Sequence, residues 1–190
     1  MNLRDIINAS FNEAVKVLTM GTSSSALFRA RERAYVKSLI KQLQSEYENE
    51  DQRVFASSKR GNANDFGTNH LLYDIAVCRI GAGGTAERKP EDFLYVAEAL
   101  WQIEIDFSRE WRSVIQAVNR LNCGAAPDKL LIASALAQGN ERLLNTLRTP
   151  AAAGKSRWHI AFVPHPEDWE DDKGAPQVWR LAEDGWAVAP

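Results

Sequence analysis

The most informative pattern of apolar and polar positions lies between residues 93 and 122, where it predicts a buried strand followed by an amphipathic helix. Successive side chains of a strand point to opposite faces, so one face of this strand is expected to be wholly apolar. That face contains Tyr95, Ala97, Ala99, Trp101, Ile103, Ile105 and Phe107. The other face ends in Glu104 and Asp106, which are costly to bury unless they are paired or bind a cation. Ser108 is the expected N-cap of the helix, whose apolar stripe comprises Trp111, Ile115, Val118 and Leu121.

Two helices are predicted before this strand. Apolar residues at a helical period indicate one helix over residues 3–19 and a longer one over residues 26–47. Glu32 falls within the apolar stripe of the longer helix, four residues after Phe28 and four before Val36. A second stripe repeats a basic residue at every fourth position: Arg29, Arg33, Lys37 and Lys41. Such a stripe is typical of a solvated helix face, and the alternative is an edge that contacts phosphate groups.

The remaining patterns predict further strands and one more helix. Asp74 interrupts the apolar pattern of a central strand over residues 70–80, and residues 81–92 are expected to form a flexible connection. The other expected elements are a strand at 53–59, a loop at 60–69, a strand at 130–134, a helix at 136–148, a strand at 158–163 and a closing hairpin around 183–185. This order predicts an α/β fold with a mixed central β-sheet flanked by helices.

Length and composition are those of one globular domain. A chain of 190 residues can bury a sizeable core, and its sequence has no apolar run near the ~20 residues of a membrane span. Cys78 and Cys123 have no metal-binding spacing and are expected to be buried free thiols in a cytoplasmic protein. The formal charge of −2 does not indicate nucleic-acid binding, but basic residues gather between positions 29 and 41 and acids between 167 and 184.

Four acids stand where an apolar core would not favour them: Glu32, Asp74, Glu104 and Asp106. If the two central strands form a hairpin and the long helix packs on it, their carboxylates converge. Such a cluster implies protonation, a basic partner or a hard divalent cation such as Mg²⁺. Each acid also has a structural alternative. Asp74 would be a satisfied core carboxylate, and Glu32 would pair with Arg29 or another basic residue of its own helix. The two acids of the later strand would pair with Arg109, Arg112 or Arg120.

The order of a helix with Glu32, a strand with Asp74, a strand with Glu104-x-acid, a helix and a strand resembles that of the PD-(D/E)XK nucleases, which have the restriction-endonuclease-like fold. The resemblance covers residues 26–134 and implies an αβββαβ core. A single domain over residues 1–190 would then add an N-terminal helix in 1–20 and a C-terminal extension with a hairpin in 135–190. In that family, acids at the positions of Asp74 and Glu104 bind Mg²⁺ or Mn²⁺, and a helix acid such as Glu32 completes the site.

The sequence departs from the family pattern at one position, because Asp106 replaces the lysine expected two residues after Glu104. In the family that lysine orients the attacking water and stabilises the charge of the transition state. The basic candidates to replace it are Arg109 and Arg112, on the following helix, and Lys59 and Arg60. Asp106 is alternatively the ligand of a second metal ion, or the mark of a site that has lost its activity.

The resemblance therefore implies a Mg²⁺-dependent nuclease that hydrolyses phosphodiester bonds, with DNA as the expected partner. Its catalytic site would contain Asp74, Glu104, Glu32 and Asp106, and the basic stripe would contact the phosphate backbone. The alternative is a non-catalytic binding or assembly module on the same fold, which would associate with a protein partner or a second copy of the chain. The missing lysine and the acidic, tryptophan-rich C-terminal region favour this alternative.

Overall fold

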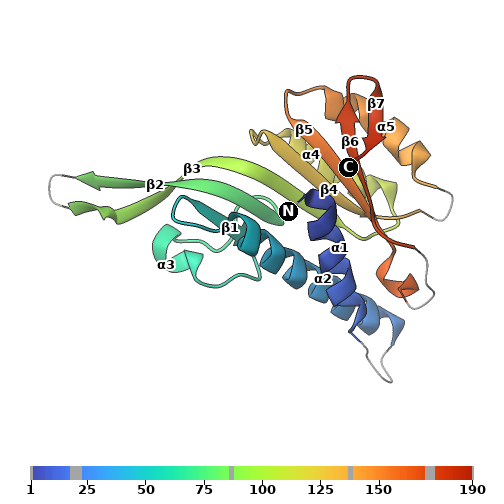
Figure 1. Ribbon diagram of the computed structural model, residues 1–190, viewed down its shortest axis with the longest axis horizontal. Helices are drawn as coiled ribbons and strands as arrows, with labels where there is room; N and C mark the ends of the chain where they lie inside the picture. The colour runs from blue at the N-terminus through green and yellow to red at the C-terminus, as the bar shows by residue number, and fades with distance from the viewer. Residues whose placement is uncertain (1, 18–22, 86–87, 137–138, 170–173, 190) are drawn as a thin grey trace.

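A computed structural model of the protein shows one β-sheet with helices on both faces (Figure 1). The structure describes residues 2–17, 23–85, 88–136, 139–169 and 174–189. The elements in these ranges are α1 (Leu3–Val15), α2 (Ser24–Tyr47), β1 (Gln52–Ala56), α3 (Asn62–Phe66), β2 (Ile75–Thr85), β3 (Arg88–Asp106), α4 (Trp111–Asn122), β4 (Asp128–Ser134), α5 (Glu141–Ala152), β5 (Arg157–Val163), η1 (Pro166–Asp168), β6 (Gln177–Ala182) and β7 (Gly185–Val188). The predicted α/β class is confirmed. Among the described helices, none has the length and apolar character needed to cross a bilayer.

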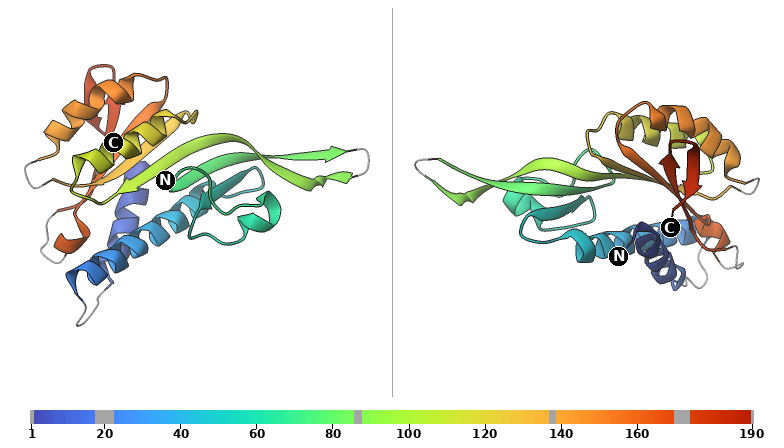
Figure 2. Two further views of the ribbon diagram at one scale, coloured as in Figure 1. Left: turned by 180° about the vertical axis from the view of Figure 1, so that it is seen from behind. Right: turned by 45° about the horizontal axis from the view of Figure 1, so that its top comes forward.

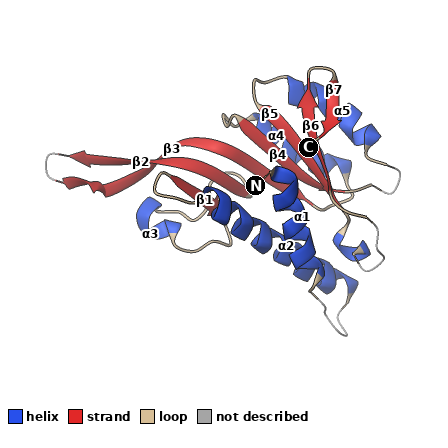
Figure 3. Ribbon diagram, in the orientation of Figure 1, coloured by secondary structure: helices blue, strands red, loops and turns tan. Residues whose placement is uncertain are grey.

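The sheet is mixed, as the order of elements predicted, and its strands lie side by side in sequence order from β1 to β7 (Figure 3). β2 is antiparallel to both of its neighbours, β1 and β3. β4 is parallel to β3, and β5 is parallel to β4, whereas β6 and β7 return antiparallel. Each parallel pair requires a crossover connection, and α4 and α5 provide these two crossovers.

The helices form two layers, one on each face of the sheet (Figure 2). β4 shows the arrangement most clearly because both of its faces are buried. Leu130 and Ile132 pack in the core that also holds the buried residues of α1 and α2. The alternate residues Leu131 and Ala133 pack in a second core with the buried residues of α4 and α5. The period-two alternation of a strand therefore separates the two helical layers.

The predicted apolar stripe of α2 packs on the core: Leu39, Ile40 and Leu43 are buried, and Phe28, Val36 and Tyr47 pack against them. Two further residues of the helix, Arg31 and Tyr35, are also buried. Glu32 is partly buried, as are Phe28 and Val36 on either side of it. The guanidinium of Arg31 donates a hydrogen bond to the carbonyl oxygen of Pro166 at 2.7 Å and lies 5.8 Å from the ring centre of Trp169. Arg31 therefore joins α2 to the segment around η1.

β2 and β3 continue well beyond the rest of the sheet as a two-stranded arm (Figure 1). The prediction of a flexible connection over residues 81–92 is therefore wrong for most of that range, because the two strands pair as far as Thr85 and Arg88. The pairing is interrupted by irregularities, one of them where Val77 pairs with Trp101 and Cys78 pairs with Ala99.

This irregularity in β3 changes which residues share a face. Trp101 packs against the core beneath α1 and α2, whereas Ala99 packs in a small cluster around Phe55 and Cys78. The seven alternate apolar residues between positions 95 and 107 consequently do not share one buried face. A β-bulge of this kind shifts the alternation by one residue, and a strictly periodic pattern cannot anticipate it.

Several smaller predictions are also corrected. The N-cap of α4 is Glu110 and not Ser108, and Trp111, which was expected in the apolar stripe, is 63% exposed. Both cysteines are free thiols, but only Cys78 is buried, whereas Cys123 is exposed. The expected loop at 60–69 contains the short helix α3. The closing hairpin is confirmed as β6 and β7.

Candidate functional site

Asp74 lies in an exposed bend directly before β2, so its predicted place inside a strand over residues 70–80 is wrong. Its carboxylate Oδ2 accepts a hydrogen bond from the backbone N–H of Ile105 at 2.8 Å. β2 and β3 are antiparallel, and Ile75 pairs with Ile103, so the beginning of β2 lies beside the end of β3. Asp74 is therefore held next to the strand end that carries Glu104 and Asp106.

Glu32 and Asp74 line the same cavity, which has a volume of about 460 Å³. The other residues around it are Arg33, Val36, Lys37, Ser57, Ser58 and Ile105. The cavity thus combines one acid and two basic residues of α2 with an acid from the beginning of β2. The two serines follow β1 directly, and the sequence pattern predicted no role for them.

The environment of Glu32 disfavours its ionised form. Burial raises the pKa of the Glu32 carboxyl above its ordinary value, and the negative charges of Asp74 and Asp106 act in the same direction. Arg33 and Arg29 oppose this shift. Glu32 therefore lies within electrostatic range of two other acids from the predicted cluster.

Glu104 points to the opposite face of the sheet, toward α4, and its side chain is 1% exposed. Arg120 Nε donates a hydrogen bond to Glu104 Oε2 at 2.9 Å, and Arg120 Nη2 donates to the same oxygen. Burial raises the pKa of Glu104, Arg120 lowers it, and the charges of Asp74 and Asp106 raise it further. This ion pair is one of the structural alternatives that the sequence left open for Glu104.

Two carboxylate oxygens at the end of β3 are buried without a hydrogen-bond partner: Glu104 Oε1 and Asp106 Oδ2. Asp106 is 8% exposed, and its other oxygen accepts a hydrogen bond from the backbone N–H of Ser108 at 2.8 Å. Buried polar atoms in native proteins normally have a partner, so an unpaired one requires an explanation. Carboxylate oxygens of this kind fit a hard divalent cation, which prefers oxygen ligands.

Glu32 shares the cavity with Asp74 on the side of α2, whereas Glu104 pairs with Arg120 on the side of α4. The charges of Asp74 and Asp106 act on both glutamates, so the four acids are electrostatically linked. Across the described ranges, however, no three His, Cys, Asp or Glu side chains are placed to hold one metal ion. A shared metal ion would therefore require a movement of side chains.

The basic stripe of α2 faces solvent beside this cavity. All four of its residues are exposed: Arg29, Arg33, Lys37 and Lys41. A second cavity, of about 730 Å³, shares Lys37 and Ser58 with the first and also contacts Lys41. Arg31 lies on the same helix but is buried, so it does not belong to this surface. The two adjoining cavities place positive side chains beside the acids Glu32 and Asp74.

Two of the basic residues expected to replace the family's lysine bind acids elsewhere. Arg109 forms an ion pair with Asp168 at 2.7 Å. Lys59 forms an ion pair with Glu48. Arg120, which the sequence offered only as a structural partner, is the basic residue that contacts the acid cluster. Arg120 is an exposed residue of α4 whose long side chain reaches the buried carboxylate of Glu104. Helical spacing alone therefore did not identify it as the partner of Glu104.

No protein-family model, curated protein or solved structure matches this chain.

Proposed function

We propose that the protein is a divalent-metal-dependent nuclease that hydrolyses phosphodiester bonds of nucleic acid, with DNA as the first substrate to test. The observation that carries this proposal is the pair of buried, unpartnered oxygens of Glu104 and Asp106 beside Asp74. A structural ion pair with Arg120 accounts for Glu104 Oε2 but leaves these two oxygens without a role. Binding of a cation would satisfy both.

The proposed metal ligands are Asp74 and Glu104, with Glu32 and Asp106 as supporting acids. Mg²⁺ or Mn²⁺ bound there would offset charge on a phosphodiester and lower the pKa of a water molecule. The chain's own residues would position the substrate. Asp74 is held in place by the N–H of Ile105, and Arg33 and Lys37 line the same cavity, where they would bind a phosphate oxygen.

The order of elements also supports a restriction-endonuclease-like core. α2, β1, β2, β3, α4 and β4 follow one another as helix, three antiparallel strands, crossover helix and parallel strand. This is the αβββαβ order that the resemblance implies. The acids stand at corresponding points of the order, before β2 and at the end of β3.

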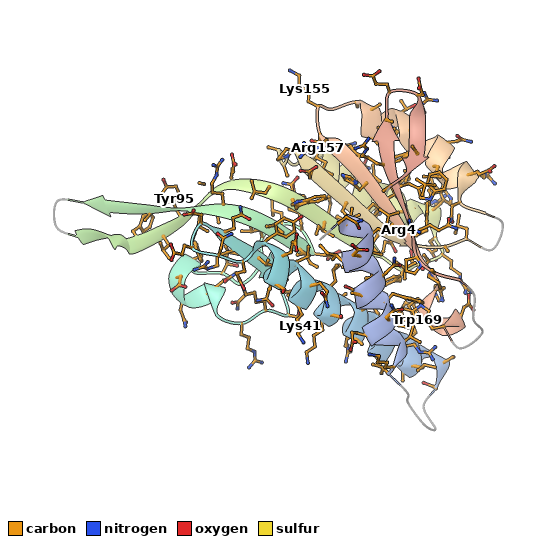
Figure 4. All side chains as sticks on the ribbon, viewed as in Figure 1. Arg4, Lys41, Tyr95, Lys155, Arg157 and Trp169 are labelled. Carbon is orange, nitrogen blue, oxygen red and sulfur yellow. The ribbon has the colours of Figure 1, made fainter. Side chains whose placement is uncertain are left out.

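The exposed stripe of α2 supports nucleic acid as the substrate class. Its four basic residues present a row of positive charge to solvent, and Arg33, Lys37 and Lys41 line the two adjoining cavities, although the whole chain has a net charge of −2. A polyanion binds such a row because the basic side chains neutralise its phosphates and release the counter-ions condensed on them. Figure 4 shows Lys41 on the outer side of α2, pointing away from the sheet.

A cleavage assay tests the proposal. The protein is incubated with single- and double-stranded DNA and RNA in Mg²⁺, in Mn²⁺ and in chelator. We expect metal-dependent cleavage by the wild type and its loss in Asp74→Asn, because the amide is a poorer metal ligand than the carboxylate. Asp65→Asn is the matched control, since Asp65 is exposed on α3. Cleavage that survives Asp74→Asn would contradict the proposed site.

The second candidate is a non-catalytic binding or assembly module on the same fold. The contact that favours it is the ion pair between Glu104 and Arg120, which neutralises a predicted metal ligand within the protein. This candidate predicts no cleavage of any substrate in metal, together with a stable complex or oligomer in solution. Gel-shift and light-scattering measurements on the samples of the cleavage assay therefore separate the two candidates.

A further inference from the structure

The arm of β2 and β3 has no further strand beside it along much of its length. β1 pairs with β2 only as far as Arg79, and β4 pairs with β3 only from Trp101 onward. Beyond these points the two strands of the arm pair with each other alone among the described residues. A two-stranded ribbon is marginally stable in water unless it packs on another surface. The arm, which Figure 1 shows extending away from the helices, is therefore expected to gain stability from a partner.

Two aromatic side chains of β3 cover one face of the arm. Tyr95 pairs with Gly81, and a Cβ atom at Gly81 would lie only 2.6 Å from Tyr95 Cζ. Phe93 pairs with Gly83, where a Cβ atom would lie 3.2 Å from Phe93 Cδ1. The two rings therefore lie directly over the glycines, and they stack on each other with their centroids 6.2 Å apart.

This surface, called here the aromatic face, consists of Phe93, Tyr95, Gly81 and Gly83. It is open to solvent, because Phe93 is 58% exposed and Tyr95 is 44% exposed. Figure 4 shows Tyr95 on the arm, away from the helices that cover the rest of the sheet. An exposed group of large apolar side chains of this kind marks a contact surface.

The edge of β3 is less suited to association than the aromatic face. Two residues of β3, Ala97 and Leu100, have no partner in β2, and the register shifts at both points. Such bulges disturb the regular backbone pairing that an added strand would need, and natural proteins use them to protect sheet edges. A partner is therefore expected to pack on the face of the arm and not to extend the sheet.

The charges beside the aromatic face favour a protein surface over a polyanion. Among the arm residues whose side chains the structure describes, the charged ones are Arg79 and Glu98, and they form an ion pair with each other. This part of the arm therefore has no net charge, in contrast to the basic stripe of α2. A polyanion binds where basic side chains can neutralise its phosphates, and the aromatic face offers none that is free of an acid.

We infer that the aromatic face is the contact surface between two copies of the chain, whose arms pack face to face about a two-fold axis. A two-fold contact requires a surface that complements itself. The aromatic face meets this requirement because it is flat and uncharged, and because aromatic rings pack favourably on other rings. The second arm gives each ribbon a layer on its aromatic face, as in packed pairs of sheets.

The small size of the aromatic face limits the strength of this contact. A fully buried aromatic side chain covers ~150–250 Å², and about half of that area is still exposed for Phe93 and Tyr95. The contact therefore belongs to the transient interfaces of less than ~1,200 Å². We expect a reversible dimer that forms at high protein concentration and dissociates on dilution, unlike the stable oligomer of the second candidate function.

Sedimentation equilibrium of the protein over a wide range of concentrations tests the inference. The wild type should show a monomer–dimer equilibrium. Phe93→Glu should weaken dimerisation by at least about tenfold, because like charges at a contact are strongly unfavourable. Trp111→Glu is the matched control, since Trp111 is 63% exposed and lies on α4, outside the arm. It should dimerise like the wild type.

A charge-exchange experiment separates a direct contact from a loss of arm structure. Phe93→Lys alone should also be monomeric. An equimolar mixture of Phe93→Glu and Phe93→Lys should associate as a heterodimer, because the two-fold axis brings the two positions close together and their charges then attract. Loss of arm structure in the variants would leave the mixture monomeric. A monomeric mixture would therefore overturn the inference that the aromatic faces contact each other.

The remaining outcomes also decide the question. The inference is wrong if the wild type is monomeric at every concentration, or if Trp111→Glu abolishes a dimer that Phe93→Glu retains. If the wild type is monomeric and Phe93→Glu weakens the binding of labelled single-stranded DNA, the aromatic face stacks on bases instead. The acid cluster and the basic stripe take no part in the contact, so the cleavage assay tests the proposed function separately.

Discussion

The side chain of Asp74 accepts a hydrogen bond from the backbone N–H of Ile105, 31 residues later in the chain, at 2.8 Å. This contact joins the residue before β2 to the last part of β3. The carboxylate satisfies a backbone donor, and backbone N–H groups in a folded protein require an acceptor. The same contact brings the charge of Asp74 close enough to raise the pKa of both Glu32 and Glu104.

The first prediction separates the two roles of Asp74. Asp74→Asn keeps an oxygen acceptor for the N–H of Ile105 and removes the negative charge, so it should be at least as stable as the wild type without metal. Asp74→Ala removes the acceptor as well and should be less stable than Asp74→Asn by about 1 kcal/mol. Urea unfolding in chelator measures the difference. Equal stability of the two variants would show that the hydrogen bond contributes nothing.

The second prediction concerns the pH dependence that Glu32 contributes. Its folded-state pKa is raised, mainly by burial and then by Asp74, so the folded protein binds this proton more tightly than the unfolded chain. The stability that this proton contributes to the fold is present below the ordinary pKa of glutamate. It is lost as the pH rises from that value through the folded-state pKa. The amide of Glu32→Gln stays neutral at every pH. The free energy of unfolding of this variant, relative to that of the wild type, should therefore grow through this window and then remain constant.

This advantage should stay below about 1 kcal/mol, because solvent screens a half-buried carboxylate. Urea unfolding of both proteins between about pH 4 and pH 8 measures it. Glu50→Gln, at an exposed residue beyond α2, is the control and should run parallel to the wild type. A Glu32→Gln curve that also runs parallel would mean that burial and Asp74 have little effect on Glu32.

The third prediction distinguishes two arginines of α2 that differ in burial. Arg31 is 1% exposed and donates a hydrogen bond to Pro166, so Arg31→Ala leaves a cavity and an unpaired carbonyl beneath the segment around η1. We expect a loss of about 2–4 kcal/mol in the free energy of unfolding. Arg33→Ala, at an exposed position, should change it by less than about 0.5 kcal/mol. Similar losses in the two variants would contradict the burial of Arg31.

The fourth prediction concerns the basic stripe. If Arg33 and Lys37 each contact a phosphate group, changing both to Gln should reduce the slope of log affinity against log salt by about 2. Fluorescence anisotropy with a labelled DNA at several salt concentrations measures the slope. The control changes Arg142 and Lys155 to Gln, which removes the same charge, and Figure 4 shows Lys155 far from Lys41. Equal slopes for the two double variants would rule out a specific contact by the stripe.

The fold was largely predictable from the sequence because its signals are local. The continuous apolar run of β4, the helical period of α2 and the turn residues between β6 and β7 each depend on neighbours a few positions away. Boundaries were less predictable where tertiary contacts override local pattern. The arm of β2 and β3 is an example, since residues 81–85 and 88–92 were expected in a loop but belong to the two strands.

The site was predictable in part. Asp74, Glu104 and Glu32 were identified as candidate residues because acids are unusual in otherwise apolar patterns. Their arrangement was not predictable, because residue spacing does not determine which face of the sheet a carboxylate reaches after a bulge. The pairing of Glu104 with Arg120 depends on the packing of α4 on β3, and three arginines were equally placed in the sequence.

The sequence by itself determined the class of the fold, the order of most of its elements and the presence of acids at the end of the strand that forms β3. These properties follow from the periodicity of side chains, which depends only on residues close together in the sequence. Only the tertiary structure decided that the charges of Asp74 and Asp106 act on both Glu32 and Glu104, that Arg31 is buried and that Arg120 neutralises Glu104. Those relationships depend on strand register and helix packing, which bring together residues far apart in the chain.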